Sequence, residues 1–445
     1  MTRPYRSARG PGPRWLASFT CVAFTLACPA RAQNAGEDAF REATKWTVQV
    51  RTSINRPFVE DEMGSALGAG LVVDAGRGWI LTNAHVSGHS FGHTMIAFMN
   101  GEPLPARRVY VDPHLDLAIL AYDPSALEHA PPEPTLDCST FPPVGHPVGA
   151  FGHPWGFRFT GTRGITSAIT TRLGPNMLQT DAPINAGNSG GPLISLETGR
   201  VVGVNAAKIA DEGVEGISFA VPMPYACTII DLLKRGIDPS PPQRLVDFAL
   251  DDDDEQTMIV ARARLPAGSI DLRDGDQIVG VEGARQPPRT ESDLFDSMRG
   301  RLDHVQLTVV RAGRSTVLSG SWPAAPRITE RHGLWISGAL IAESEPLTAG
   351  LITGGPRLMI HHVEPGSDAE GASLSPFDLI ISADGRPVDS LDTLQALAAS
   401  AAHAHKPLNL TLLRLTGEVR VELFVYQRRS LPVSDLEVVG PEARP

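Results

Sequence analysis

A serine set among glycines is the residue of this chain best suited to chemistry. The segment Gly187-Asn-Ser-Gly-Gly-Pro-Leu193 places Ser189 on a turn that the flanking glycines make possible. A serine hydroxyl attacks a carbonyl only when a base takes its proton, and backbone N–H groups must then hold the developing oxyanion. We therefore predict that Ser189 is a nucleophile. The N–H groups of Gly187 and Ser189, with that of Asn188 nearby, are the predicted oxyanion hole, although a plain glycine-rich hairpin would carry the same letters.

A serine nucleophile needs a base, and the base needs a residue that orients it. His85 lies near the end of one apolar, strand-like run, and Asp116 begins another. Each residue alone is typical of a packed histidine or a solvated acid. Together with Ser189 they follow the chain order His, Asp, Ser that chymotrypsin-type proteases use. Asp112 is a competing acid, but Pro113 follows it and favours a turn there.

The segments that must position these residues are mostly short strands. Two pairs of apolar runs flank turn sequences that contain glycine, which predicts two hairpins. Strands this numerous, without alternating helices, predict a sandwich or a barrel, closed by one helix between Pro224 and Gly236. The strand-like runs lie at 70–74, 79–86, 116–122, 147–151, 177–180, 192–195, 200–206 and 217–221.

An internal repeat follows a proline-rich linker at 236–242. The segment Asp276-Gln-Ile-Val-Gly-Val-Glu-Gly283 matches Asp378-Leu-Ile-Ile-Ser-Ala-Asp-Gly385. Each copy is followed by a segment with an apolar helical face and then by β-rich sequence. The repeat predicts two α+β modules of ordinary domain size, separated near 323–326.

These motifs together resemble the HtrA family of serine proteases. The resemblance implies a mostly β chain, in which a chymotrypsin-like double β-barrel carries the triad in its cleft and two small α+β domains of the PDZ type follow. The matching segments are Thr82-Asn-Ala-His-Val86, Asp112-Pro-His-Leu-Asp-Leu-Ala-Ile-Leu120, Phe151-Gly-His-Pro-Trp-Gly156, Gln179-Thr-Asp-Ala-Pro-Ile-Asn-Ala-Gly-Asn-Ser-Gly-Gly-Pro-Leu193 and Gly216-Ile-Ser-Phe-Ala-Val-Pro222.

The same resemblance implies a substrate pocket near Ile184, Ile209 and Ile217. Branched apolar walls would leave a small uncharged pocket, so we expect cleavage after small aliphatic residues. Lys208 departs from the family pattern, which usually has an apolar residue there.

The two PDZ-like copies differ in how well they match. In the second copy, 333–336 and 337–340 are candidates for the loop that holds a peptide's terminal carboxylate. The first copy has a shorter connecting segment at 265–275 and no glycine-containing loop near 245–250, so it is predicted to be degenerate. The predicted domain map is a signal peptide at 1–32, a protease domain at 33–237, PDZ-like domains at 243–322 and 328–430, and a C-terminal tail at 431–445.

The start of the chain predicts export. Several arginines precede an apolar stretch at 15–27, and Ala30-Arg-Ala32 offers small residues to a signal peptidase. We therefore predict a periplasmic protein, with lipid attachment at Cys28 as a minor alternative. Cys138 and Cys227 would then be the two cysteines left, either paired or as separate buried thiols. Related barrel proteases have disulfides in similar places, which favours the pair as a hypothesis.

The composition narrows the possible partners. With 39 basic and 50 acidic residues, the net charge of −11 argues against general nucleic-acid binding. His85, His89 and His93 are regularly spaced, and 251–255 is acidic, but neither pattern matches a known metal site. No metal or other cofactor is predicted.

The predicted function is ATP-independent endopeptidase activity on misfolded exported proteins, with C-terminal peptides bound by the second PDZ-like domain. The family resemblance implies a homotrimer or a multiple of trimers. The alternative is a non-proteolytic holdase or peptide-binding scaffold with a resting, malformed active site.

Overall fold

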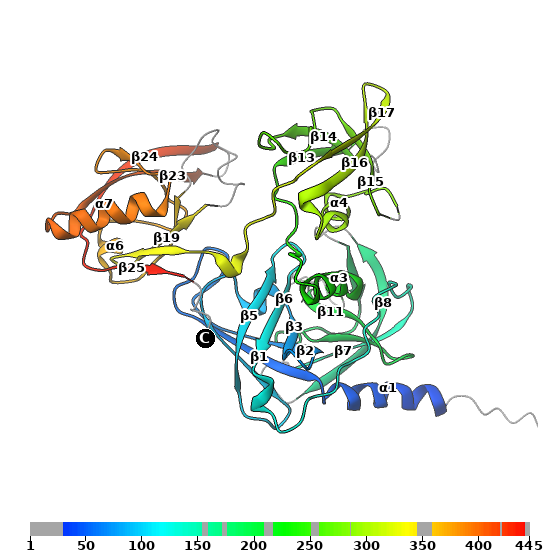
Figure 1. Cartoon of the computed structure of the whole chain (residues 1–445). Coiled ribbons are helices and arrows are strands. Elements are labelled where there is room, and N and C mark those ends of the chain that lie inside the picture. The colour runs from blue at the N-terminus through cyan, green and yellow to red at the C-terminus, as the bar shows by residue number, and fades with distance from the viewer. Residues whose placement is uncertain are drawn as a thin grey trace, which may run out of the picture.

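The computed structural model describes residues 30–153, 159–170, 176–208, 217–250, 258–284, 286–344, 358–418 and 421–440. The predicted signal peptide therefore lies almost wholly outside the described residues, as do Ile209 and the acidic run 251–255. The first described element is α1 (Ala30–Ala43), which leads into the first barrel (Figure 1).

Two closed antiparallel barrels form the first half of the protein. The first has the strand order β1-β2-β3-β6-β5-β4, and the second β10-β11-β12-β9-β8-β7. This confirms the mostly β, chymotrypsin-like double barrel. The first barrel consists of β1 (Thr47–Ile54), β2 (Gly64–Asp74), β3 (Trp79–Thr82), β4 (His93–Phe98), β5 (Leu104–Asp112) and β6 (Leu117–Tyr122). The second consists of β7 (Pro147–Gly152), β8 (Thr160–Thr170), β9 (Met177–Thr180), β10 (Pro192–Ser195), β11 (Val201–Lys208) and β12 (Ser218–Pro222).

Strands form here because apolar and β-branched residues are frequent in them, and β3 and β6 of the first barrel are buried on both faces. All six residues of β6 are buried, and so are all four of β3. Such continuous burial is typical of barrel-core strands rather than of strands with one wet face. The short helix α2 (Ala84–Ser87) interrupts the first barrel directly after β3.

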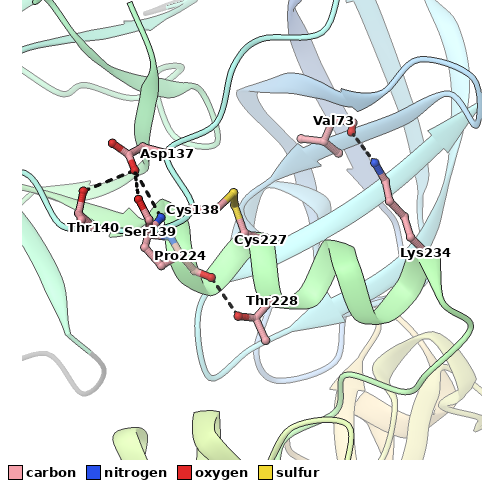
Figure 2. The surroundings of a disulfide bond; sticks show 9 residues. All are labelled: Val73, Asp137, Cys138, Ser139, Thr140, Pro224, Cys227, Thr228 and Lys234. Atoms are coloured by element: carbon pink, nitrogen blue, oxygen red, sulfur yellow. Dashed lines mark hydrogen bonds between the residues drawn. A yellow bond between two sulfur atoms is a disulfide. The ribbon is translucent and has the colours of Figure 1, made fainter. Parts of the chain in front are cut away.

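A disulfide fastens the helix that ends this half of the chain. Helix α3 (Met223–Lys234) carries Cys227, which is bonded to Cys138 on the segment between the barrels (Figure 2). The Asp137 carboxylate accepts hydrogen bonds from the hydroxyl groups of Ser139 and Thr140, which shapes the turn around Cys138. Of the two possibilities open for these cysteines, the structure has the pair.

Two further sheets follow, each with a helix. The first module has the sheet β13-β14-β15-β16-β17, and the second has β24-β23-β21-β20-β19-β18-β25 with β22 attached to β21. Figure 1 shows the first module above the barrels, with α4 above α3, and the second module at the left, next to the first barrel. The first consists of β13 (Val246–Leu250), β14 (Met258–Ala263), β15 (Gln277–Val281), α4 (Glu291–Met298), β16 (Val305–Arg311) and β17 (Arg314–Gly320). The second consists of β18 (Gly333–Ile336), β19 (Ala339–Glu343), β20 (Leu358–Val363), α6 (Asp368–Gly371), β21 (Leu379–Ala383), β22 (Arg386–Pro387), α7 (Leu391–His403), β23 (Leu408–Glu418), β24 (Val421–Leu431) and β25 (Leu436–Val439).

The two modules repeat one internal ion pair. Asp276 begins the matched segment of the first copy and binds Arg311, with 2.7 Å between Oδ1 and Nε. Asp378 begins the segment of the second copy and binds Arg414 at 2.6 Å in the same way. Both carboxylates are buried, and each arginine comes from a later strand of its module. The equivalent pairs indicate that the sequence repeat is also a structural repeat.

Candidate active site

Two neighbouring strand ends bring His85 and Asp116 together. Strands β3 and β6 are paired, with Thr82 opposite Ala118. His85 lies in the first turn of α2, just beyond β3, and Asp116 lies just before β6. Asp116 has a positive φ of 53°, which turns its side chain toward α2, and aspartate tolerates this conformation better than most residues.

The Asp116 carboxylate contacts both the backbone and the ring of His85. Oδ1 accepts the His85 backbone N–H at 3.0 Å, and Nδ1 lies 2.9 Å from Oδ1 and 2.8 Å from Oδ2. A carboxylate only accepts hydrogen bonds, so Nδ1 carries the proton and Nε2 is left as the base. The buried Asn83 amide donates to the Asp116 carbonyl at 2.8 Å and fixes the backbone of this acid. Sequence reasoning missed Asn83, although it stands two residues before His85.

Ser189 lies on a turn held between the two barrels. Its carbonyl accepts the N–H of Ala69 from β2 at 2.8 Å, and the N–H of Gly190 donates to Asn205 on β11 at 2.8 Å. Gly190 has a φ of 83°, and a Cβ there would lie 2.2 Å from both the Ala69 carbonyl and the Thr82 hydroxyl. Only glycine fits so close an approach. The turn therefore lies directly against β2 and β3, and β3 leads to His85.

The Ser189 hydroxyl donates to a backbone carbonyl and not to the base. Its Oγ donates to the carbonyl of Ala206 at 2.9 Å. Among the hydrogen bonds of the described residues, none joins Ser189 to His85. Hydrogen bonds between a nucleophile and its base are often long or misaligned without substrate, so the arrangement is compatible with a resting enzyme.

The three predicted oxyanion donors differ in their partners. The N–H of Asn188 donates to the Asn185 carbonyl at 2.9 Å, so this group is already satisfied. For the N–H groups of Gly187 and Ser189, no acceptor is found within the described part of the chain. The Asn188 side chain is fully buried and its amide has no partner there either.

His153 is a neighbour of this turn to which sequence reasoning gave no role. Its backbone N–H donates to the Gly187 carbonyl at 2.9 Å. This hydrogen bond orients the peptide group between Gly187 and Asn188, next to the proposed oxyanion hole. Burial lowers the pKa of the His153 imidazole to about 4, so the ring is neutral near pH 7. The motif Phe151-Gly-His-Pro-Trp-Gly156 contained this histidine, but the family resemblance matched it only to the start of the second barrel.

The predicted pocket residues that the structure describes differ in burial. Ile184 is 3% exposed and packs with the core of the second barrel, including Ala182 and Leu193. Ile217 precedes β12 and is half-buried. Ile209 lies outside the described residues. Both described positions are apolar, with Ile184 inside the barrel core and Ile217 partly exposed.

Asp112, the competing acid, has a different partner. Its carboxylate is fully buried and lies 2.6 Å from Nη1 of Arg299, the residue that follows α4 in the first module. It also accepts the Tyr110 hydroxyl at 2.9 Å and the Leu115 N–H at 3.0 Å. This acid therefore links the protease half to the first module and is not beside His85.

The described residues contain neither a metal-binding cluster nor a membrane-spanning helix. No group of three or more His, Cys, Asp or Glu residues there is placed to hold a metal ion. Instead, the Asp61 carboxylate binds His89, accepting from its backbone N–H at 2.7 Å and contacting Nδ1 at 3.1 Å. No helix in the described ranges is long and apolar enough to cross a membrane.

Comparison with known proteins agrees with this geometry. Residues 68–204 match the family model of the trypsin-like peptidase domain, a range that contains His85, Asp116 and Ser189. A probable periplasmic serine endoprotease, DegP-like, from Halomonas elongata is 29% identical over 367 residues, which cover 75% of this chain and 73% of the relative. A protein of the same description from Brucella suis is 28% identical over 385 residues, 81% of this chain and 74% of the relative.

The solved structure of the HtrA-type protease AlgW with a tripeptide superposes with a TM-score of 0.54 at 25% identity, over 65% of this chain and 97% of that one. These comparisons support the resemblance of the chain to HtrA-type proteases, and residues 68–204 match the trypsin-like peptidase domain. The chain is accordingly a serine endopeptidase.

Proposed function

We propose that this chain hydrolyses peptide bonds of misfolded exported proteins, without ATP, through His85, Asp116 and Ser189. The observation that carries the proposal is the double contact of Asp116 with the backbone and the ring of His85. That contact sets both the tautomer and the direction of the imidazole, which is the task of the acid in a serine protease triad.

The reaction follows from the positions of these groups. A docked peptide draws the Ser189 hydroxyl away from Ala206, and Nε2 of His85 takes its proton as Oγ attacks the scissile carbonyl. The N–H groups of Gly187 and Ser189 stabilise the negative oxygen of the tetrahedral intermediate. His85 then gives the proton to the leaving amine, and water releases the acyl group by the same steps.

The proposed substrate preference is for small aliphatic residues before the cleaved bond. Ile184 and Ile217 support it because both are apolar and branched, and Ile209 is the third proposed wall. Digestion of a peptide library should therefore give cleavage after Val, Ala or Thr. Dominant cleavage after Arg or Phe would refute this preference.

A periplasmic location is proposed on three grounds. The curated relatives are named periplasmic. The disulfide between Cys138 and Cys227 suits an oxidising compartment. The export signal proposed at 1–32 gives the route.

The proposed domain map assigns 33–237 to the protease, 243–322 and 328–430 to PDZ-like domains, and 431–445 to a tail. The second PDZ-like domain is proposed to bind C-terminal peptides. The first is proposed to be a contact module, since Arg299 ties it to Asp112. The proposed assembly is a homotrimer built through the protease domain.

A second function is favoured by one observation. The Ser189 hydroxyl bonds to Ala206 and not to His85 in this conformation, as expected of a holdase whose active site rests. Casein digestion by the purified chain and by Ser189→Ala separates the two functions. The peptidase proposal expects digestion that the substitution abolishes, with at most about a 10³- to 10⁴-fold advantage over water left. Equal behaviour of the two proteins, with aggregation of a client suppressed by both, would favour the holdase.

A further inference from the structure

The last described strand of the chain lies on the outer edge of the second module. Strand β25 pairs antiparallel with β18, with Leu436 opposite Ile336 and Val439 opposite Gly333. Within the described residues, β19 is the one other neighbour of β18, so β18 would otherwise be the edge of its sheet. In Figure 1, β25 runs along the base of the second module, on the side of the first barrel.

This pairing has the form in which a sheet receives a foreign peptide. An extended segment adds to an exposed edge through main-chain hydrogen bonds, and alternate side chains enter pockets. Leu436 packs against the core of the module, and helix α7 lies against both β18 and β25. Val439 packs with Trp335 and Leu340, whereas Val438 is 54% exposed. The chain's own segment is thus bound as a ligand strand would be.

Polar contacts also bind the segment that contains β25 and favour acidic side chains in it. The N–H of Ser337 donates to the Asp435 carbonyl at 3.1 Å, and the N–H of Ser434 donates to the Ser337 hydroxyl at 2.9 Å. The Trp335 indole N–H donates to the Asp435 carboxylate at 2.9 Å. Glu437 forms an ion pair with Arg56 at 2.7 Å. The edge therefore selects an extended peptide that combines aliphatic with acidic side chains.

We propose that Ser434–Val439 is an intramolecular ligand of the second module, and that a substrate peptide of the same aliphatic and acidic character binds β18 only by displacing it. The inference deepens the proposed function, on whose peptide-binding module it rests. It adds that the peptide edge is closed in the resting protein and names the segment that closes it.

The tether makes this segment a strong competitor. Only the connection 432–435 separates β25 from the end of β24, so β25 stays close to β18 even when a peptide displaces it. A short linker of this kind gives an effective concentration in the millimolar range. A free peptide then binds with an apparent affinity reduced by the fraction of molecules whose edge is open.

The same segment contacts the loop beside the active site. Arg56, the partner of Glu437, lies 4.2 Å above the Trp335 ring and belongs to the loop between β1 and β2. Further along this loop, Asp61 accepts the N–H groups of His89 and Ser90, which follow the helix that carries His85. Displacement of β25 removes Glu437 from Arg56, so peptide binding at β18 changes the charge environment of this loop.

The test measures peptide binding by the full chain with Ser189→Ala, so that nothing is cleaved. The probe is a fluorescent peptide Ser-Asp-Leu-Glu-Val-Val, followed by anisotropy. A chain that ends at Pro432 should bind it at least about tenfold more tightly than the full chain, because the tethered competitor is gone. A chain that ends at Gly440 is the matched control and should bind as the full chain does. Equal affinity of the Pro432 chain and the full chain would overturn the proposal.

A point substitution covers the case in which truncation unfolds the module. Leu436→Asp in the full chain should expel β25, since it places a carboxylate against the module core, and should raise the affinity for the probe as truncation does. Val438→Asp is the control, because that side chain is exposed and the strand should stay bound. If Leu436→Asp binds the probe no better than Val438→Asp does, the edge is not closed by this segment. None of these outcomes depends on hydrolysis, so they are independent of the casein assay for Ser189.

Discussion

Replacing Arg299 by Met should loosen the first module from the protease half. The Arg299 side chain is 1% exposed, and its Nη1 contacts Asp112 at 2.6 Å and the Pro239 carbonyl at 2.7 Å. Its Nε contacts Asp296 at 2.8 Å. Without the guanidinium, two carboxylates remain buried beside a carbonyl with no cation to neutralise them.

The expected effect is a loss of stability, whose size follows from the burial of this ion pair. Removing one partner of a buried ion pair costs about 3–5 kcal/mol, mainly because the other charge is left uncompensated. The loss should become smaller as the pH falls, because protonation of Asp296 removes one of the two unpaired charges. Burial already raises the pKa of Asp296 to about 6 although Arg299 lowers it, so in the variant without Arg299 the recovery should begin above that pH.

Calorimetry and hydrogen exchange test this prediction. The unfolding transition of the first module should move to lower temperature, and the amides of the linker 238–243 should exchange faster than in the parent. Arg235→Met is the control, because Arg235 forms an exposed ion pair with Asp231 and its loss should cost less than about 1 kcal/mol. If both variants lose the same small amount, the pair between Arg299 and Asp112 is not the anchor of the module.

Three further predictions concern the barrels and the second module. Replacing both Cys138 and Cys227 by Ser should cost about 4–5 kcal/mol by the chain-entropy account for a separation of 89 residues, measured by denaturant unfolding; an unchanged midpoint would contradict it. Gly190→Ala should abolish casein digestion while the barrels stay folded, because its Cβ meets the Ala69 carbonyl, whereas Gly199→Ala, with nothing within 4 Å, should leave digestion intact. Activity that survives in Gly190→Ala would show that the turn can shift. Burial lowers the pKa of His361 from 6.5 to about 4, so this residue stabilises the fold above pH 6.5, and up to about 3 kcal/mol is lost as the pH falls toward 4. A pH series of unfolding with His361→Gln checks this, and an equal pH dependence in both proteins would contradict it.

Local sequence was sufficient for much of the site. The glycines around Ser189 are required by the turn itself, and a turn is encoded by contiguous residues. Eight of the twelve barrel strands were predicted at least in part because they contain short apolar runs near turn signals, whereas β1, β4, β5 and β8 were missed. The repeat of the two modules was predictable because equivalent structures bury equivalent positions of the sequence. Asp276 and Asp378 are two such positions, and each is paired with an arginine from a later strand.

The sequence favoured Asp116 over Asp112 because Pro113 favours a turn at Asp112, but it did not contain the contacts that the two acids make. Asp112 and Asp116 are four residues apart in one motif. The pairing of β3 with β6 and the positive φ of Asp116 direct that carboxylate to the ring. Asp112 is bound by Arg299, 187 residues further along the chain. No sequence pattern near Asp112 contains that information.

The sequence by itself determined which residues could perform the chemistry, since nucleophile, base, acid and turn glycines each follow from residue type and short spacing. The tertiary structure alone decided that Arg299 binds Asp112, that the Ser189 hydroxyl donates to Ala206, and that β25 pairs with the edge of β18. The physical reason is that these contacts join segments distant along the chain. Their partners are selected by packing of the whole fold rather than by the backbone preferences of neighbouring residues.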